Sequence, residues 1–159
     1  MLMPNILLLE DEALIALDVE RTFADAEIGQ TTSFASCVGA LSWLRTITPD
    51  VAVIDIFLRD GECDEVAEIL VARGVPLVIH SARRGVASDT HRVFLNGTWI
   101  CKPSDPDELT RAVRNCLAKP VQRQSAATNG ENLKARKGKP GVFRPNYLYY
   151  SGTRDEHRI

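Results

Sequence analysis

Short apolar runs and helix-periodic segments alternate along the first 118 residues of the chain. Apolar positions in the helical segments recur every three or four residues, as on one buried face of a helix. The pattern predicts strands at residues 6–9, 31–34, 51–54, 77–79 and 99–101. It predicts helices at residues 13–24, from 37 to a stop at Pro49, at 65–73, at 86–95 and from 106 onward. Strand and helix therefore alternate five times.

This alternation favours an α/β fold, because parallel strands need a crossover helix to reach their neighbours. The predicted strands are continuous apolar runs, which is typical of strands covered on both faces. We therefore expect a doubly wound, five-stranded parallel sheet with helices on both faces. In such a sheet, ligands bind outside the carboxyl ends of the strands.

Two helices carry more specific expectations. The second helix is predicted to turn Cys37, Val38, Leu41 and Leu44 inward. Asp105 is expected to cap the last helix, because its carboxylate can accept hydrogen bonds from the unpaired N–H groups of the first turn.

The net charge of −2 is the sum of an acidic body and a basic tail. Residues 1–118 carry 10 basic and 18 acidic groups, whereas residues 119–159 carry 9 basic and 3 acidic groups. Only 6 of the last 41 residues are Leu, Ile, Val or Phe, too few to offset the entropy lost on ordering. We predict one domain over 1–118 and a flexible, disordered tail over 119–159.

No apolar run is long enough for a transmembrane helix, and the first ten residues lack the pattern of a secretory signal. A cytoplasmic protein is therefore expected. The four cysteines, at positions 37, 63, 101 and 116, form no CxxC pair, so buried thiols are expected rather than a zinc site. Cys63 could be exposed and reactive, or it could be a loop residue with no special role.

Polar residues follow four of the five predicted strands. Glu10 and Asp11 follow the first strand, Asp55 the third, Ser81 the fourth and Lys102 the fifth. Because the first and third strands are neighbours in a doubly wound sheet, we expect the carboxylates of Asp11 and Asp55 to lie close together.

Three carboxylates in one crevice repel one another, and each raises the pKa of the others unless a positive charge enters. Lys102 supplies one positive charge, which cannot balance Glu10, Asp11 and Asp55 alone. A divalent cation can do so, and all-oxygen ligands favour magnesium or manganese over zinc. The same acidic loop argues against a dinucleotide site, where glycines would bring backbone N–H groups to a phosphate.

At these positions the sequence resembles the receiver domain of bacterial two-component response regulators, of the single-domain, CheY-like kind. The resemblance covers about residues 3–118. It rests on four segments in order: ILLLEDE (6–12), PDVAVIDIFLRDG (49–61), VPLVIHSA (75–82) and WICKP (99–103). It implies a flavodoxin-like fold with strand order 2-1-3-4-5.

The resemblance assigns roles to the acidic residues. Asp55 matches the aspartate that accepts a phosphoryl group, and also a metal ligand. Asp11 matches the carboxylate that binds Mg²⁺ directly, and Glu10 the one that usually acts through water. The backbone carbonyl of Phe57 matches a further ligand of the metal.

The resemblance also assigns the phosphoryl-binding and switching groups. Ser81 matches the hydroxyl residue that meets the phosphoryl group, and Lys102 matches the lysine that pairs with a phosphoryl oxygen. Trp99 stands where the family usually has a Tyr or Phe that moves when Ser81 moves. The peptide bond between Lys102 and Pro103 is expected to be cis, as X–Pro bonds permit.

The implied function is that of a phospho-acceptor response regulator in a two-component phosphorelay, in which phosphorylation of Asp55 switches protein–protein interactions. The protein is not expected to be an enzyme beyond Mg²⁺-dependent phosphoryl acceptance and slow self-dephosphorylation. The expected partners are a sensor histidine kinase or a histidine phosphotransfer protein, and a downstream protein target. A homodimer is a further option, and no specific DNA binding is expected.

Two alternatives stay open. Lys134, Arg136, Lys137 and Lys139 in the basic tail are compatible with a nucleic-acid or membrane-surface binder. A Mg²⁺-dependent phosphohydrolase of similar topology would need a general acid near Asp55, and Phe57 supplies none.

Overall fold

The computed structural model describes residues 3–82 and 89–118. Its strands are β1 (Asn5–Leu9), β2 (Gln30–Phe34), β3 (Val51–Ile54), β4 (Phe57–Leu58), β5 (Gly61–Glu62), β6 (Leu77–Ser81) and β7 (Thr98–Cys101). Its helices are α1 (Ala13–Asp25), α2 (Cys37–Leu44), α3 (Asp64–Ala72), the 3-10 helix η1 (Asp89–Asn96) and α4 (Pro106–Ala118). The predicted tail, 119–159, and the beginning of the helix predicted at 86–95 lie outside the described residues.

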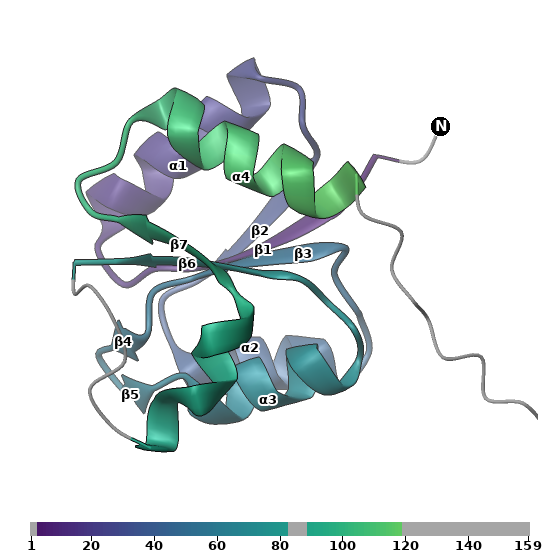
Figure 1. The fold of residues 1–159 in the computed structure, drawn as a ribbon, viewed down its shortest axis with the longest axis vertical. Helices are drawn as coiled ribbons and strands as arrows, with labels where there is room; N and C mark the ends of the chain where they lie inside the picture. The colour runs from purple at the N-terminus through teal and green to yellow at the C-terminus, as the bar shows by residue number, and fades with distance from the viewer. Residues whose placement is uncertain (1–2, 83–88, 119–159) are drawn as a thin grey trace, which may run out of the picture. The chain divides into compact units, whose positions relative to one another are not determined.

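Five parallel strands form the main sheet, in the order β2-β1-β3-β6-β7. This is the order 2-1-3-4-5 of the five predicted strands, so the predicted fold is confirmed. Figure 1 shows α1 and α4 on one face of the sheet and α2, α3 and η1 on the other. Among the described residues, no helix combines the length and apolar character needed to cross a bilayer.

The sheet separates two apolar cores. Successive side chains of a strand point to opposite faces, so Leu7 and Leu9 enter one core while Ile6 and Leu8 enter the other. Each core contains an aromatic ring with no exposed surface. Phe94 belongs to the core of Leu7 and Leu9, and Phe23 belongs to the core of Ile6 and Leu8. Burial on both faces is the reason that the strands are continuous apolar runs.

The predicted inward face of α2 needs one correction. Cys37 and Leu44 are buried and Leu41 packs against the same core, but Val38 is 70% exposed. The prediction that Val38 faces inward is wrong, because each residue turns a helix by about 100° and the buried stripe passes through Cys37, Ala40 and Leu44.

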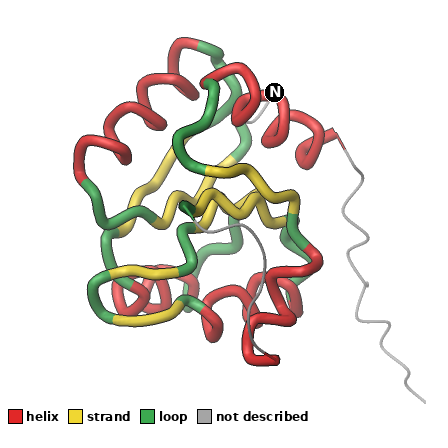
Figure 2. The backbone as a smooth tube through the Cα atoms, turned by 60° about the vertical axis from the view of Figure 1, so that its left-hand side comes forward, coloured by secondary structure: helices red, strands yellow, loops and turns green. Residues whose placement is uncertain are grey.

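The hairpin β4–β5, which joins β3 to α3, has no counterpart among the predicted elements. Figure 2 shows it as two short strands beside the main sheet. Asp60, between the two strands, accepts hydrogen bonds from the N–H groups of Cys37 and Val38 at 2.9 and 3.0 Å. These N–H groups lie at the start of α2, where no helical partner is available to them. Asp60 therefore caps α2, and these bonds lower the pKa of its carboxyl.

The start of α4 is capped as predicted. Asp105 Oδ1 accepts a hydrogen bond from the N–H of Asp107 at 2.8 Å. Pro106 occupies the first helical position, where the missing N–H has no cost. The cap fixes where α4 begins, four residues after Lys102.

Replacing Asp105 with Ala should lower the free energy of unfolding by about 1 kcal/mol, because the first turn of α4 loses its acceptor. Asp105→Asn is the matched control, since its amide oxygen can accept the same bond. Urea denaturation of both variants checks this. An Asn variant as unstable as the Ala variant would show that the cap is not the source of the loss.

Candidate functional site

Most of the predicted polar residues meet at the carboxyl-terminal edge of the main sheet. The pairing of β1 with β3 places Glu10 and Asp55 at the ends of adjacent strands. A hydrogen bond of 2.9 Å from the Asp55 N–H to the carbonyl of Leu9 holds this alignment. Lys102 follows directly after β7, and its side chain reaches across the same edge.

Lys102 makes the central contact of this edge. Its Nζ lies 2.5 Å from Glu10 Oε2 and 2.5 Å from Asp55 Oδ2. Because both oxygens are 2.5 Å from one nitrogen, they lie no more than 5 Å apart. The three side chains are largely withdrawn from solvent, with exposures of 10% for Lys102, 1% for Glu10 and 14% for Asp55. The contact is therefore poorly screened by water.

The pKa of Lys102 reflects two opposing effects. Burial alone disfavours the ammonium form and would lower the pKa. Hydrogen bonds and charge attraction from Asp55 and Glu10 outweigh burial, and the pKa stands above its usual value. Lys102 is therefore fully charged at neutral pH.

The carboxylates of Glu10 and Asp11 have different partners. Glu10 is buried, and its second oxygen accepts the N–H of Glu12 at 3.1 Å. Asp11 is paired instead with Arg59, whose Nε lies 3.6 Å from Asp11 Oδ2. Arg59 also donates from Nη2 to the carbonyl oxygen of Asp11 at 3.2 Å. The Arg59 side chain is 78% exposed, so this pair adds little stability.

The sequence does not predict the position of Arg59. Three carboxylates, those of Glu10, Asp11 and Asp55, are met here by two cations, Lys102 and Arg59. Among these five described side chains, one negative charge is in excess. Arg59 contacts Asp11 because the β4–β5 hairpin turns the chain back toward β1. The pattern of apolar and polar residues in the sequence does not predict that turn.

The donor set fits a hard divalent cation in its chemistry. Glu10 Oε2 and Asp55 Oδ2, carboxylate oxygens from adjacent strand ends, lie no more than 5 Å apart, and hard divalent cations take oxygen ligands. Within residues 3–82 and 89–118, no three His, Cys, Asp or Glu side chains already surround a common point. Lys102 lies between Glu10 and Asp55, and Arg59 contacts Asp11. Arg59 would therefore compete with a metal ion for the Asp11 carboxylate.

Phe57 is placed beside Asp55 by the start of β4. Its N–H donates to Asp55 Oδ1 at 3.4 Å, a long bond, and its side chain is 36% exposed. Asp55 Oδ2 is thus bound tightly by Lys102, whereas Oδ1 accepts the longer and weaker bond from Phe57.

Ser81 and Trp99 lie on the same face of the sheet. Ile79 is paired with Trp99 on the neighbouring strand. Ser81 lies two positions after Ile79, and side chains two positions apart on a strand point to the same face. Ser81 is buried. The Trp99 ring is partly buried against the core beneath α2 and α3, and its Nε1–H donates to the carbonyl of Phe94 at 3.1 Å. The Lys102–Pro103 peptide bond is cis, as expected.

Comparisons with known proteins agree with this arrangement. No model of a known protein family matches the chain. Over 118 residues the chain is 28% identical to a heme response regulator of Staphylococcus epidermidis, covering 72% of this chain and 52% of that protein. The receiver domain of a Francisella response regulator matches with a TM-score of 0.59 at 26% identity, over 72% of this chain and 96% of that one. These similarities support a response regulator receiver domain in the described part of this chain.

Another neighbour concerns the metal. The receiver domain of a sensor histidine kinase from Pseudomonas aeruginosa matches with a TM-score of 0.63 at 20% identity, over 74% of this chain and 99% of that one. In that protein a magnesium ion is coordinated in the active site cleft. This chain spans about half the length of the curated relative it matches, so the receiver domain corresponds to one part of that relative.

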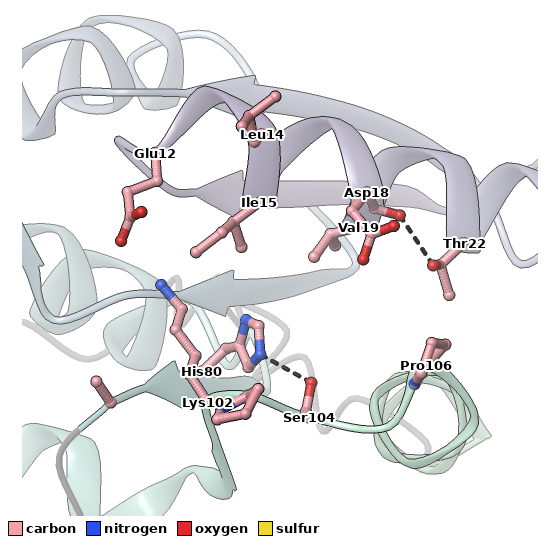
Figure 3. A pocket seen from close by; sticks show the side chains of 12 residues that line it. Glu12, Leu14, Ile15, Asp18, Val19, Thr22, His80, Lys102, Ser104 and Pro106 are labelled. Atoms are coloured by element: carbon pink, nitrogen blue, oxygen red, sulfur yellow. Dashed lines mark hydrogen bonds between the residues drawn. The ribbon is translucent and has the colours of Figure 1, made fainter.

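The receiver domain also contains a cavity that the sequence does not predict. Its volume is about 640 Å³, and it lies between α1 and the segment that joins β7 to α4. Figure 3 shows Lys102 and His80 on one side of it, and Glu12, which precedes α1, and Ile15 of α1 on the other. His80 is 4% exposed, and its Nε2 is 2.9 Å from Ser104 Oγ. Its Nδ1 has no hydrogen-bond partner among the described residues.

His80 is a buried, hydrogen-bonded histidine on the opposite face of β6 from Ser81. Burial lowers the pKa of its imidazole to about 4, and the positive charge of Lys102 acts in the same direction. The charge of Asp55 opposes them but is the smallest of the three effects. His80 is therefore neutral in the folded receiver domain at neutral pH.

This lowered pKa predicts acid sensitivity. Unfolded histidine takes up a proton near pH 6.5, whereas folded His80 resists until about pH 4, so stability falls as the pH drops through that window. From pH 7.5 to 5, the wild type should lose about 2 kcal/mol more stability than His80→Gln, in which nothing titrates at this position. Urea denaturation at the two pH values measures the difference. Equal losses in both proteins would contradict the assignment.

Proposed function

We propose that this receiver domain accepts a phosphoryl group on Asp55 within a two-component phosphorelay. The observation that carries the proposal is the contact of Lys102 with Asp55 and Glu10 at the carboxyl-terminal edge of the sheet. A lysine held charged beside an aspartate is suited to phosphoryl transfer, where most of the catalysis is positioning and charge neutralisation.

The two oxygens of Asp55 have different roles in this proposal. Oδ2 is bound by Lys102, so Oδ1, with its long contact to the Phe57 N–H, is the oxygen available for attack. Oδ1 forms a bond to phosphorus while the phosphorus–nitrogen bond of a phosphohistidine breaks and the imidazole nitrogen takes a proton. The product is an acyl phosphate, and Lys102 then pairs with a phosphoryl oxygen.

Asp11 and Asp55 would hold Mg²⁺ directly, with Glu10 acting through water and the Phe57 carbonyl as a further ligand. The ion supplies positive charge to the phosphoryl oxygens when it is bound. The excess negative charge of the edge and the magnesium of the Pseudomonas receiver domain support this assignment. Arg59 would leave Asp11 as the ion binds, since both compete for the same carboxylate.

Phosphorylation would then alter the protein contacts of the domain. A phosphoryl group adds a charge of about −1.5 to −2, which attracts the hydroxyl of Ser81. Trp99 lies on the same face of the sheet and would respond, although its hydrogen bond to the Phe94 carbonyl must break for a large movement.

The partners follow from the same proposal. A sensor histidine kinase or a histidine phosphotransfer protein supplies the phosphoryl group, and a downstream protein reads the phosphorylated state, in the cytoplasm and with homodimerisation as an option. The domain acts as a regulator and not as a classical enzyme, apart from slow loss of its own phosphoryl group. The alternative of a nucleic-acid or membrane-surface binder concerns residues 119–159, outside the described residues.

Asp55→Asn should abolish labelling by acetyl phosphate in the presence of Mg²⁺, because the amide cannot form an acyl phosphate. Asp50→Asn is the matched control. Asp50 accepts a hydrogen bond from the N–H of Asn5, at the start of β1 and so at the opposite edge of the sheet. Intact-mass spectrometry measures the added phosphoryl group, expected in the wild type and in Asp50→Asn. Undiminished labelling of Asp55→Asn would exclude Asp55 as the acceptor.

A further inference from the structure

Cys37 and Cys63 form a pair of thiols that the sequence does not connect. Their sulfur atoms lie 2.6 Å apart, although the residues are 26 positions apart in the chain. Two thiols in ordinary contact stay much farther apart than this, and a covalent S–S bond is about 2.05 Å long. Cys63 lies outside any helix or strand, as a loop residue should, but it has no exposed surface, so the option that it is exposed is wrong.

Two helix ends bring the sulfurs together. Cys37 is the first residue of α2, and Cys63 directly precedes α3. The N–H of Cys37 donates to Asp60 at 2.9 Å, and the N–H of Cys63 donates to the carbonyl of Ile56 at 3.0 Å. Both backbones are therefore held by residues next to the β4–β5 hairpin. The sulfurs meet as a result of this folded arrangement and not of closeness in sequence.

We propose that Cys37 and Cys63 are a redox pair that forms a reversible disulfide in the folded receiver domain, with a peroxide as the oxidant. The disulfide would join the start of α2 to the start of α3 and so clamp the hairpin between them. Its formation needs no phosphorylation. Its effect on the hairpin beside Asp55 matters for signalling only under the proposed function.

The chemistry requires one accessible sulfur. Cys37 is the less buried of the two residues, with 9% of its surface exposed against none for Cys63, so it is assigned the attack on the oxidant. Its thiolate attacks hydrogen peroxide, the O–O bond breaks, and hydroxide leaves as a sulfenic acid forms. The sulfur of Cys63 then attacks the Cys37 sulfur and displaces the oxygen. The two thiol protons end in two water molecules, and the two electrons reduce the peroxide.

Burial sets the rate of this reaction. It raises the pKa of both thiols, and the negative charge of Asp60 raises that of Cys37 further, although the hydrogen bond from Cys63 opposes the shift. Few thiolates exist at neutral pH, so oxidation should be slow and should accelerate as the pH rises. Disulfides that form in a reducing compartment are usually transient, and the proposed bond is reversible.

The other two cysteines supply an internal reference. Cys116 belongs to the core beneath α1 and α4, on the opposite side of the sheet from Cys37 and Cys63. Cys101 lies in β7, and its sulfur contacts the carbonyl of Lys102 at 3.6 Å. Neither residue should enter the disulfide.

The test uses the full-length protein, oxidised with hydrogen peroxide, then denatured, alkylated and digested without reduction. Peptide mapping should find Cys37 linked to Cys63, with a mass about 2 Da below that of the two thiol peptides, and dithiothreitol should reverse the link. Cys101 and Cys116 should remain alkylated. Alkylation of both Cys37 and Cys63 after oxidation, or a link to another cysteine, would overturn the proposal.

Thermal unfolding supplies the second measurement. A bond formed within the native arrangement should raise the Tm of the oxidised wild type by about 10 °C. Cys37→Ser should show no rise, and Cys101→Ser should keep it. A lower Tm on oxidation would mean that the bond forms against the native arrangement, which also contradicts the proposal. Both results are independent of whether Asp55 accepts a phosphoryl group.

Discussion

Repulsion among carboxylates at one edge of the sheet is the constraint on which the rest of the site depends. Glu10, Asp11 and Asp55 are brought there by parallel strands that the two cores hold in register. Lys102 meets two of them at 2.5 Å from within a largely buried position. Removing one partner from such a buried arrangement typically costs about 3–5 kcal/mol, because an uncompensated charge is left behind. Each buried charge at this edge therefore depends on the oppositely charged group that it contacts.

The three carboxylates Glu10, Asp11 and Asp55 contact only two cations among the described side chains named here, Lys102 and Arg59. This excess of one negative charge favours the binding of a further cation under the proposed function. Arg59 is exposed and bound weakly, so it can leave, whereas Lys102 is buried and firmly held. The edge thus combines a firmly held cation, Lys102, with a weakly held one, Arg59, on neighbouring carboxylates. Such a combination suits a site that binds and releases a charged group.

Much of this arrangement is predictable from sequence. The apolar runs predict the strands, and the order of parallel strands predicts which strand ends are neighbours. The contact between Asp55 and Lys102 is therefore foreseeable from two residues that each end a strand. The prediction for Val38 is wrong because α2 is short and carries apolar residues on several sides, so its sequence does not indicate which face is buried.

Several contacts that the sequence does not predict involve the hairpin or the cavity. Arg59 reaches Asp11 because the β4–β5 hairpin turns back toward β1, and Cys37 reaches Cys63 because Asp60 of the same hairpin binds the start of α2. Such turns depend on tertiary hydrogen bonds, here those accepted by Asp60, and leave no periodic pattern. The hydrogen bond between His80 and Ser104 likewise joins a strand to a loop. The path of that loop depends on tertiary packing, so the sequence pattern does not predict it.

The most direct test of the account is a titration with Mg²⁺ and beryllofluoride, a mimic of the phosphoryl group, followed by the fluorescence of Trp99. A Trp43→Phe background removes the second tryptophan, whose ring lies against Phe34. The account predicts a saturable change that needs both components and disappears in Asp55→Asn. An equal change in Asp55→Asn, or a full change without Mg²⁺, would contradict it.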